Sequence, residues 1–476
     1  MRVELSNYLD NQRPLLEQLI SKLSQFDYAS VLGVDTKGKS YNVSRTGSSI
    51  NDSMWSERGF VIRVFNGVNY SEYSFDQLNN EIIEEVVSII TKIASDDIDK
   101  LKQQGVELFD YPLIDDNEIE DSMESEVKIL PSEVSAKDKI DKLSEVMNEG
   151  LKLSDKLIDF RVGYEEVHIS KVFYSTKKKL SQSFIYSTAS MVPLVKKGAE
   201  IKYDAKGVSG LKGVEILDEL TGAEKLVNTA IELLDAEKIL PGEYEIICDP
   251  AVSGLIAHEA FGHGVEMDMF VKNRAKGAEY VGKRIASDKV VMKDGALSAK
   301  EVGTYLFDDE GTLGTDTTVI NKSILEAGIS DLLSALKLGT NPTGNGRRES
   351  FERKVYTRMT NTFFAPGEDK LEDMIASIKK GYLLENYNSG MEDPKNWGIQ
   401  CMISRGREII DGKLTGKIVA PVLLTGYVPE LLESISMVSG SEDLELSGGG
   451  ACGKGHKEWA KTSTGGTYIK AVGRLG

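Results

Sequence analysis

Residues 249–268 read Asp-Pro-Ala-Val-Ser-Gly-Leu-Ile-Ala-His-Glu-Ala-Phe-Gly-His-Gly-Val-Glu-Met-Asp, and they contain two of the four histidines of a 476-residue chain. Asp249 and Pro250 are a typical N-cap and first-turn pair, which predicts that a helix begins here. The preceding residues 243–248 alternate and then become apolar, as a strand does. We therefore expect a strand that leads directly into a short helix carrying both histidines.

The two histidines, His258 and His263, are five residues apart, and Glu259 directly follows the first of them. In the helical zinc motif His-Glu-x-x-His, the histidines are four residues apart and share one helix face. On a regular helix, positions five apart diverge by about 140°. A π-type turn would realign the two imidazoles, and Gly262 would provide the backbone freedom for it. The pattern favours a metal site over two histidines that pack in a core or face solvent.

A catalytic zinc site usually takes three protein ligands and leaves a fourth position for water. Glu266 and Asp268 are candidates for the third ligand, and either carboxylate could instead orient an imidazole through a hydrogen bond. Cys452 is another candidate, because it lies in a glycine-rich loop that allows close approach to an ion. Cys248 and Cys401 lie in strand-like segments, and we expect both to be inert buried side chains.

Several linked motifs resemble those of the TldD/PmbA metallopeptidases, which were once described as modulators of DNA gyrase. The motifs are residues 249–268, Gly344–Arg348, Arg358–Thr362, Pro366-Gly367, Cys452–Lys454 and, more weakly, Arg58–Arg63. The resemblance implies that His258, His263 and Cys452 bind one zinc ion. It also implies that Glu259 is the general base. Because all four groups are retained, the chain resembles the catalytic, TldD-type members rather than their paired relatives that lack them.

The implied activity is zinc-dependent hydrolysis of flexible or unfolded peptides, either in precursor processing or in peptide degradation. Glu259 would take a proton from zinc-bound water and pass it to the leaving amine. Peptides would be gripped as added β-strands. The candidate substrate-binding residues are Asn345, Arg347, Arg348, Arg358, Asn361 and His456. For the first five, a buried structural role is the alternative. His456 could also be a fourth metal ligand, a transition-state donor or an exposed loop residue, and we favour the exposed loop.

Two other functions remain open on the sequence. The chain could be a noncatalytic peptide-binding or assembly subunit of a two-chain protease complex, or a zinc hydrolase that acts on a non-peptide amide. The family resemblance implies a two-chain assembly in either case. The expected partner is a second copy of the chain or a related PmbA/TldE-type subunit.

The pattern of predicted elements indicates an α+β protein with two domains. Residues 1–240 predict a mixed α/β domain, with helices near 14–23, 82–93, 137–151 and 213–236 and a hairpin at Asn66-Gly67. Residues 241–476 predict a sheet-rich, barrel-like domain that carries the zinc site. Residues 115–126 contain seven acidic side chains and predict an exposed, linker-like stretch.

Charge, hydropathy and cysteine content bear on the partners and the cellular location of the protein. The chain has 75 acidic and 57 basic residues and a net charge of −18, which opposes binding to nucleic acid. No run of 18 apolar residues predicts a membrane span, and the first residues lack the apolar core of a signal peptide. Three scattered cysteines do not form a disulfide framework. We expect a cytoplasmic protein that binds neither membranes nor nucleic acid.

Overall fold

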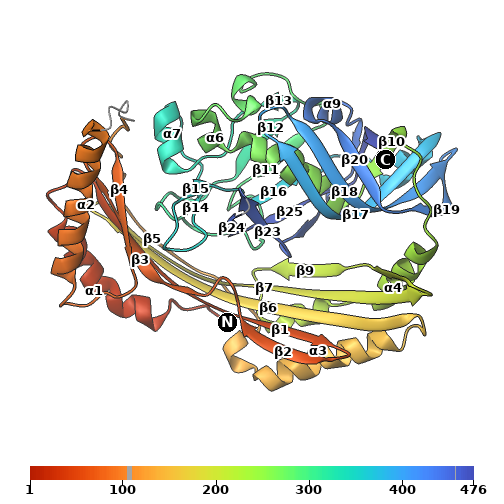
Figure 1. Cartoon of the computed structure of the whole chain (residues 1–476), viewed down its shortest axis with the longest axis horizontal. Helices are drawn as coiled ribbons and strands as arrows, with labels where there is room; N and C mark the ends of the chain where they lie inside the picture. The colour runs from red at the N-terminus through yellow and green to blue at the C-terminus, as the bar shows by residue number, and fades with distance from the viewer. Residues whose placement is uncertain (104–109, 456) are drawn as a thin grey trace.

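The computed structural model describes residues 1–103, 110–455 and 457–476. Up to residue 240, the described chain forms one nine-stranded sheet with the central order β4-β3-β1-β6-β7-β5; β2 is added to β1, and β8 and β9 to β7. Figure 1 shows this sheet as a long curved layer beneath the second body of the protein. Its strands are β1 (Ala29–Ser44), β2 (Gly47–Asp52), β3 (Glu57–Phe65), β4 (Tyr70–Phe75), β5 (Ile119–Glu124), β6 (Leu157–Ser175), β7 (Lys178–Lys197), β8 (Glu200–Tyr203) and β9 (Lys206–Gly210).

Alternation of side chains along the long strands explains why both faces of this sheet are covered. On β6, Phe160 and Val162 point to the helical side, whereas Val167 and Phe173 pack in clusters shared with the second body. A strand with a period of two places neighbouring residues on opposite faces. Apolar residues at both the odd-numbered and the even-numbered positions of a strand therefore predict a sheet that is buried between two layers, as is found here.

In the described part of the chain, four α-helices cover the outer face of the sheet in two separate groups (Figure 1). They are α1 (Asn7–Lys22) and α2 (Ile83–Gln103) at one end, and α3 (Ala136–Leu151) and α4 (Ala223–Glu232) at the other. Ser6 and Ser135 cap α1 and α3 by accepting hydrogen bonds from backbone N–H groups of the first turn. The helices expected near 14–23, 82–93 and 137–151 and the hairpin at 66–67 are confirmed.

Two expectations for this half of the chain were wrong in detail. The single helix expected over 213–236 is divided into the 3₁₀ helix η2 (Val214–Glu219), α4 and η3 (Leu233–Asp235), because Gly222 adopts a left-handed φ of 80° between the first two. The acidic stretch 115–126 contains β5, which pairs in parallel with β7. Backbone pairing does not depend on apolar side chains, so a largely exposed acidic segment still adds an edge strand.

The described residues of the second body form a barrel and a neighbouring sheet. The barrel strands β10 (Gly242–Cys248), β17 (Lys380–Asp393), β18 (Gly398–Ile410), β20 (Val422–Tyr427) and β26 (Ile469–Leu475) close into a ring, because β10 pairs with both β17 and β26. β19 (Lys413–Val419) and β21 (Met437–Val438) extend this sheet. The neighbouring sheet comprises β11 (Val291–Asp294), β12 (Thr317–Asn321), β13 (Ile324–Leu325), β16 (Asn361–Phe364), β22 (Glu445–Ser447) and β25 (Ser463–Gly466).

Short helices and two small hairpins complete this body. They are α5 (Pro250–Leu255), α6 (Met267–Val271), α7 (Leu332–Leu338), α8 (Leu371–Ala376) and α9 (Val428–Glu433), with the pairs β14 (Gly346–Arg347)–β15 (Tyr356–Thr357) and β23 (Ala451–Lys454)–β24 (Lys457–Lys461). The α+β class with a barrel-like second half is confirmed. Because η3 packs on the first sheet and β10 starts the second, we propose that the domains divide near residue 240.

Charged side chains join the two bodies at a buried contact. Arg63 on β3 forms ion pairs with Glu72 of the first body and with Glu310 of the second. Arg348 of the second body reaches back to Glu72. Burial alone would raise the pKa of Glu72, but the two guanidinium groups lower it to about 2.

This ion network predicts how stability depends on pH. The folded-state pKa of Glu72 lies below its ordinary value of 4.5. Its contribution is therefore present above pH 4.5 and lost as pH falls towards 2. We expect Glu72→Gln to lower the free energy of unfolding by about 3 kcal/mol at pH 6, with a deficit that shrinks towards pH 3. Urea unfolding of both metal-free proteins across this range measures the difference, and a pH-independent deficit would contradict this assignment.

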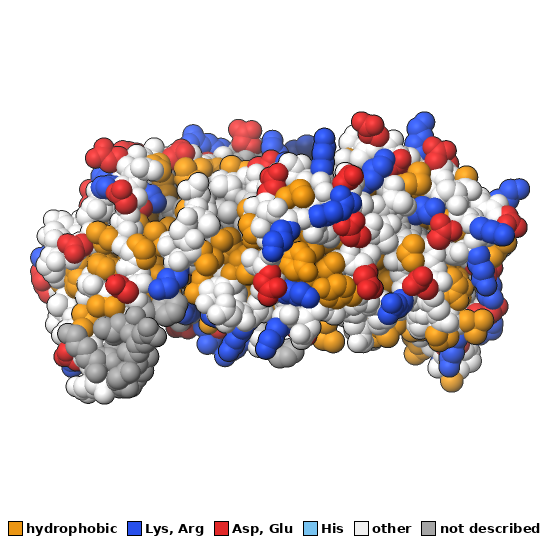
Figure 2. Space-filling model, turned by 90° about the horizontal axis from the view of Figure 1, so that it is seen from above, with side chains coloured by type: hydrophobic (Ala, Val, Ile, Leu, Met, Phe, Trp, Pro, Cys, Tyr) orange, Lys and Arg blue, Asp and Glu red, His pale blue; other side chains and the backbone are white. Residues whose placement is uncertain are grey.

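On the face seen from above, the described residues of opposite charge are mixed. Figure 2 shows Lys and Arg side chains intermingled with Asp and Glu, with hydrophobic side chains between them. Mixed charge of this kind is unlike the basic stripe that binds a phosphate backbone. Within the described ranges, no helix has the length and apolar character required to cross a membrane.

Candidate metal centre

The predicted strand and helix are present at the start of the second body. β10 leads to Asp249, whose side chain accepts a hydrogen bond from the N–H of Val252 and caps α5. α5 then continues into the π-helix η4, which spans Ile256–Gly262. The expectation of a widened turn within the His-Glu-x-x-x-His segment is thus confirmed.

The π-helix brings the two imidazoles to one side of the segment. The ring centroids of His258 and His263 are 5.3 Å apart, and the rings are nearly perpendicular, at 85°. The reason proposed for Gly262 was wrong, because its φ of −57° and ψ of −47° are ordinary helical angles. Small size is what this position requires, because a Cβ there would overlap Sδ of Met359.

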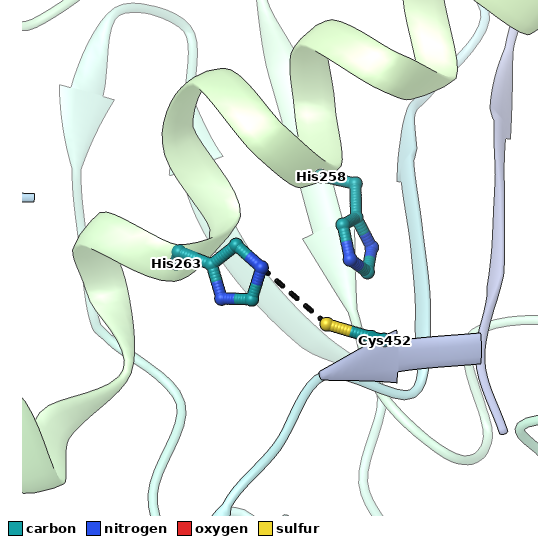
Figure 3. A group of neighbouring side chains, drawn as sticks. All are labelled: His258, His263 and Cys452. Carbon is teal, nitrogen blue, oxygen red and sulfur yellow. Dashed lines mark hydrogen bonds between the residues drawn. The ribbon is translucent and has the colours of Figure 1, made fainter. Parts of the chain in front are cut away.

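Cys452 reaches the two histidines from the far end of the chain. It lies on β23, and its Sγ is 3.4 Å from Nε2 of His263, as the dashed line in Figure 3 marks. One donor atom each from His258, His263 and Cys452 lies within 4.8 Å of the others. Among the described residues, Nδ1 of His258 is buried without a hydrogen-bond partner. Two imidazoles and one thiol are a donor set that fits a zinc ion with one position left for water.

Electrostatics within this group favour the thiolate. Burial would raise the pKa of Cys452, but the positive charges of His258 and His263 lower it well below its ordinary value. Burial would likewise lower the pKa of each histidine, and the charge of Cys452 raises both instead. The anionic sulfur that a metal ion requires is therefore already favoured by its neighbours.

Carboxylates lie on two sides of the histidines. Oε1 and Oε2 of Glu259 are 3.9 Å and 3.8 Å from Nε2 of His258 and His263, respectively, and this side chain is 25% exposed. Glu266 is buried, and its Oε2 is 3.3 Å from Nδ1 of His263. Asp268, the other carboxylate considered for orienting an imidazole, pairs instead with Lys454 and Lys272. Of these carboxylates, Glu266 lies within hydrogen-bond distance of Nδ1 of His263, where it can fix the orientation of that imidazole.

Two of the candidate substrate-binding residues lie inside the protein. Asn345 and Asn361 are both fully buried. Asn345 donates hydrogen bonds to Asp294 and to the carbonyl of Arg358, and Asn361 accepts one from Ser463. Their amides are occupied by structural hydrogen bonds, so these side chains hold loops together and do not line a path.

The remaining candidate substrate-binding residues lie in different parts of the structure. Arg347 donates to the carbonyl of Met359, and Arg348 belongs to the contact between the two bodies. Arg358 is buried, and it touches Cys452 rather than an open channel. His456 lies outside the described residues.

Two partly buried residues at this centre, Lys454 and Glu392, were not predicted from the sequence. Lys454 forms ion pairs with Glu266 and Asp268; its position two residues after Cys452 on a strand was the available signal. Glu392 lies on β17, and a Cβ on Gly264 would come within 2.5 Å of its Oε1. Burial raises the pKa of Glu392 well above its ordinary value. Nothing in the sequence around Glu392 indicated that it lies beside the histidine segment.

Two histidines and a cysteine grouped within 4.8 Å, with a glutamate beside both imidazoles, form the kind of donor set that metal-dependent hydrolases use. Residues 241–469 match the PmbA/TldA metallopeptidase C-terminal domain. The second body therefore carries the C-terminal domain of the TldD/PmbA metallopeptidases.

Known proteins similar to this chain agree with that assignment. A metalloprotease of Methanocaldococcus jannaschii is 27% identical over 444 residues, which cover 92% of this chain and 95% of the relative. A zinc metalloprotease TldD homolog of Saccharolobus solfataricus is 26% identical over 70% of this chain and 74% of its own. The fold is shared with the crystal structure of TldE from Thermococcus kodakarensis, with a TM-score of 0.72, 18% identity, and coverage of 97% of this chain and 99% of that one.

Proposed function

We propose that this protein is a zinc-dependent peptidase that hydrolyses flexible or unfolded peptides, in precursor processing or in degradation. The observation that carries the proposal is the convergence of His258, His263 and Cys452, with Glu259 beside both imidazoles. One zinc ion per chain would be held by the two histidines and the cysteine. The family relationship supports a metallopeptidase role, and the name of the Saccharolobus relative supports zinc.

Each residue would have a separate task in the reaction. A bound zinc ion supplies polarisation of a carbonyl group and a water molecule of lowered pKa. A carboxylate oxygen of Glu259 would accept a proton from the attacking water and deliver it to the leaving amine. Oε2 of Glu266 would hold a proton on Nδ1 of His263, which leaves the Nε2 lone pair directed at the centre.

The substrate would bind through its backbone. An extended peptide added to a strand edge is gripped by main-chain hydrogen bonds, which makes recognition largely independent of sequence. We propose that the working form is a dimer, with a second copy or with a related PmbA/TldE-type subunit, since a TldE protein shares this fold. The protein would act in the cytoplasm, on neither nucleic acid nor membranes.

One observation favours a second candidate, a thiol hydrolase. Sγ of Cys452, Nε2 of His263 and, on the other side of that ring, Glu266 form the order of a nucleophile, a base and an orienting carboxylate. A nucleophilic cysteine needs only one histidine as its base, so the thiol hydrolase leaves His258 without a role. A metal site uses both imidazoles and therefore fits this arrangement better. Peptidase activity of the metal-free protein would favour the thiol hydrolase. If the purified protein instead loses activity on chelation and recovers it when zinc is added, the metallopeptidase is favoured.

The direct test is purification followed by metal analysis, native mass and incubation with unfolded peptides and small non-peptide amides. We expect one zinc per chain, a dimeric mass and peptide fragments in the product mass spectrum. Cleavage of the amides alone would identify a different hydrolase. A protein with neither zinc nor cleavage would be the noncatalytic subunit.

A further inference from the structure

A buried arginine lies directly behind the cysteine of the candidate metal centre. Arg358 follows β15 and is 1% exposed. Its Nη2 is 2.9 Å from Sγ of Cys452 and 2.9 Å from the carbonyl oxygen of the same residue. Nη1 donates to the carbonyl of Glu458 on β24, so one guanidinium contacts both strands of the hairpin that carries the cysteine.

The same guanidinium also faces the histidine segment. Nε of Arg358 is 3.5 Å from Oε1 of Glu266, and the other oxygen of Glu266 is 3.3 Å from Nδ1 of His263. Cys452 and His263 are 189 positions apart in the chain. Arg358 and Glu266 thus form one buried chain of polar contacts that connects a ligand candidate from each segment.

We propose that Arg358 is a positioning residue that sets both the place and the charge of the Cys452 sulfur. This inference rests on the proposed zinc site. A thiolate ligand donates charge to a metal ion and weakens its ability to polarise a carbonyl group. A guanidinium N–H that donates to the sulfur withdraws part of that charge, and hydrogen bonds to ligand sulfurs are known to tune metal centres in this way.

The geometry requires an arginine rather than another cation. The planar guanidinium presents several donors in a fixed fork, so it contacts the sulfur, two carbonyl groups and a carboxylate at once. A lysine has one ammonium group and cannot keep all of these contacts. Burial of the cation is compensated by anions on two sides, the thiolate of Cys452 and the carboxylate of Glu266.

The test uses Arg358→Lys in the full-length protein loaded with cobalt in place of zinc. Loss of the hydrogen bond to sulfur raises the energy of the sulfur lone pairs, so the sulfur-to-cobalt charge-transfer band should move to longer wavelength. Zinc affinity, measured by competition with a chelator, should fall roughly 10- to 100-fold. Arg405→Lys is the matched control, since Arg405 is a largely buried arginine paired with Asp204, between β8 and β9, and with Glu385 on β17. Its cobalt spectrum should equal that of the unchanged protein.

The outcomes separate this inference from the zinc proposal. Failure of the unchanged protein to bind cobalt or zinc would overturn both. Normal binding together with an unaltered band and affinity in Arg358→Lys would overturn the role of Arg358 alone. If Arg358→Lys does not fold, cadmium NMR of the unchanged protein decides: coupling between cadmium and the arginine protons through the sulfur supports the inference, and its absence overturns it.

Discussion

A chain in which Glu259 is replaced by glutamine should bind one zinc ion and hydrolyse peptides roughly 10²- to 10⁴-fold more slowly than the unchanged protein. Glutamine keeps the size of the side chain but cannot accept the proton of an attacking water. Glu259 lies within 4 Å of both imidazoles without being one of the three grouped donors, so zinc stoichiometry should not change. Metal analysis and kcat for an unfolded peptide measure the two halves of this prediction.

The matched control is Glu279→Gln, which makes the same change at an exposed glutamate of the second body. It should leave both zinc content and kcat unaltered. Near-normal hydrolysis by Glu259→Gln would remove this residue from the mechanism. Loss of zinc from that variant would instead make Glu259 part of the binding site.

Cys452→Ala should lose zinc. The variant removes the anionic member of the donor set and leaves two neutral imidazoles. The affinity should fall by more than the roughly 100-fold that loss of a ligand's hydrogen-bonding partner can cost. Zinc at about 1,000 times its Kd stabilises a folded protein by about 4 kcal/mol, so added zinc should raise the Tm of the unchanged protein and not that of the variant.

Cys248→Ala and Cys401→Ala are the controls for this second prediction. Both cysteines are free and fully buried, in β10 and β18. Burial raises the pKa of Cys401 to about 12, which is the behaviour of an inert thiol. Both variants should retain one zinc per chain. A Cys452→Ala protein that also retains it would exclude the sulfur as a ligand.

The parts of the site that the sequence predicted correctly are local. Asp249 and Pro250 marked the helix start, and the spacing of His258 and His263 required a widened turn that the structure contains. The explanation given for Gly262 was wrong, because the constraint there is the sulfur of Met359, which comes from a distant strand connection. Local rules identify which backbone shape is needed. They do not identify which neighbour leaves no room for a side chain.

The predictions of the fold were likewise correct where local sequence decides the structure and wrong where contacts between distant segments decide it. Helices with a regular apolar stripe, such as α2, were predicted well, whereas β5 was read as a linker because its side chains are acidic and largely exposed. Asn345 and Asn361 were candidates for a substrate path, and the structure buries both in hydrogen bonds to segments that are remote in the sequence. Polar residues in a turn-rich stretch serve either role, and burial decides between them.

The sequence by itself determined the elements whose cause is short-range: the strand, the capped helix, the π-turn and the choice of histidine, glutamate and cysteine side chains. Only the tertiary structure decided that Cys452 lies 3.4 Å from His263, and that Arg358 stands behind the sulfur. The physical reason is range. Backbone periodicity and capping act over a few residues, whereas contacts across 189 positions exist only after the second body has folded around the histidine segment.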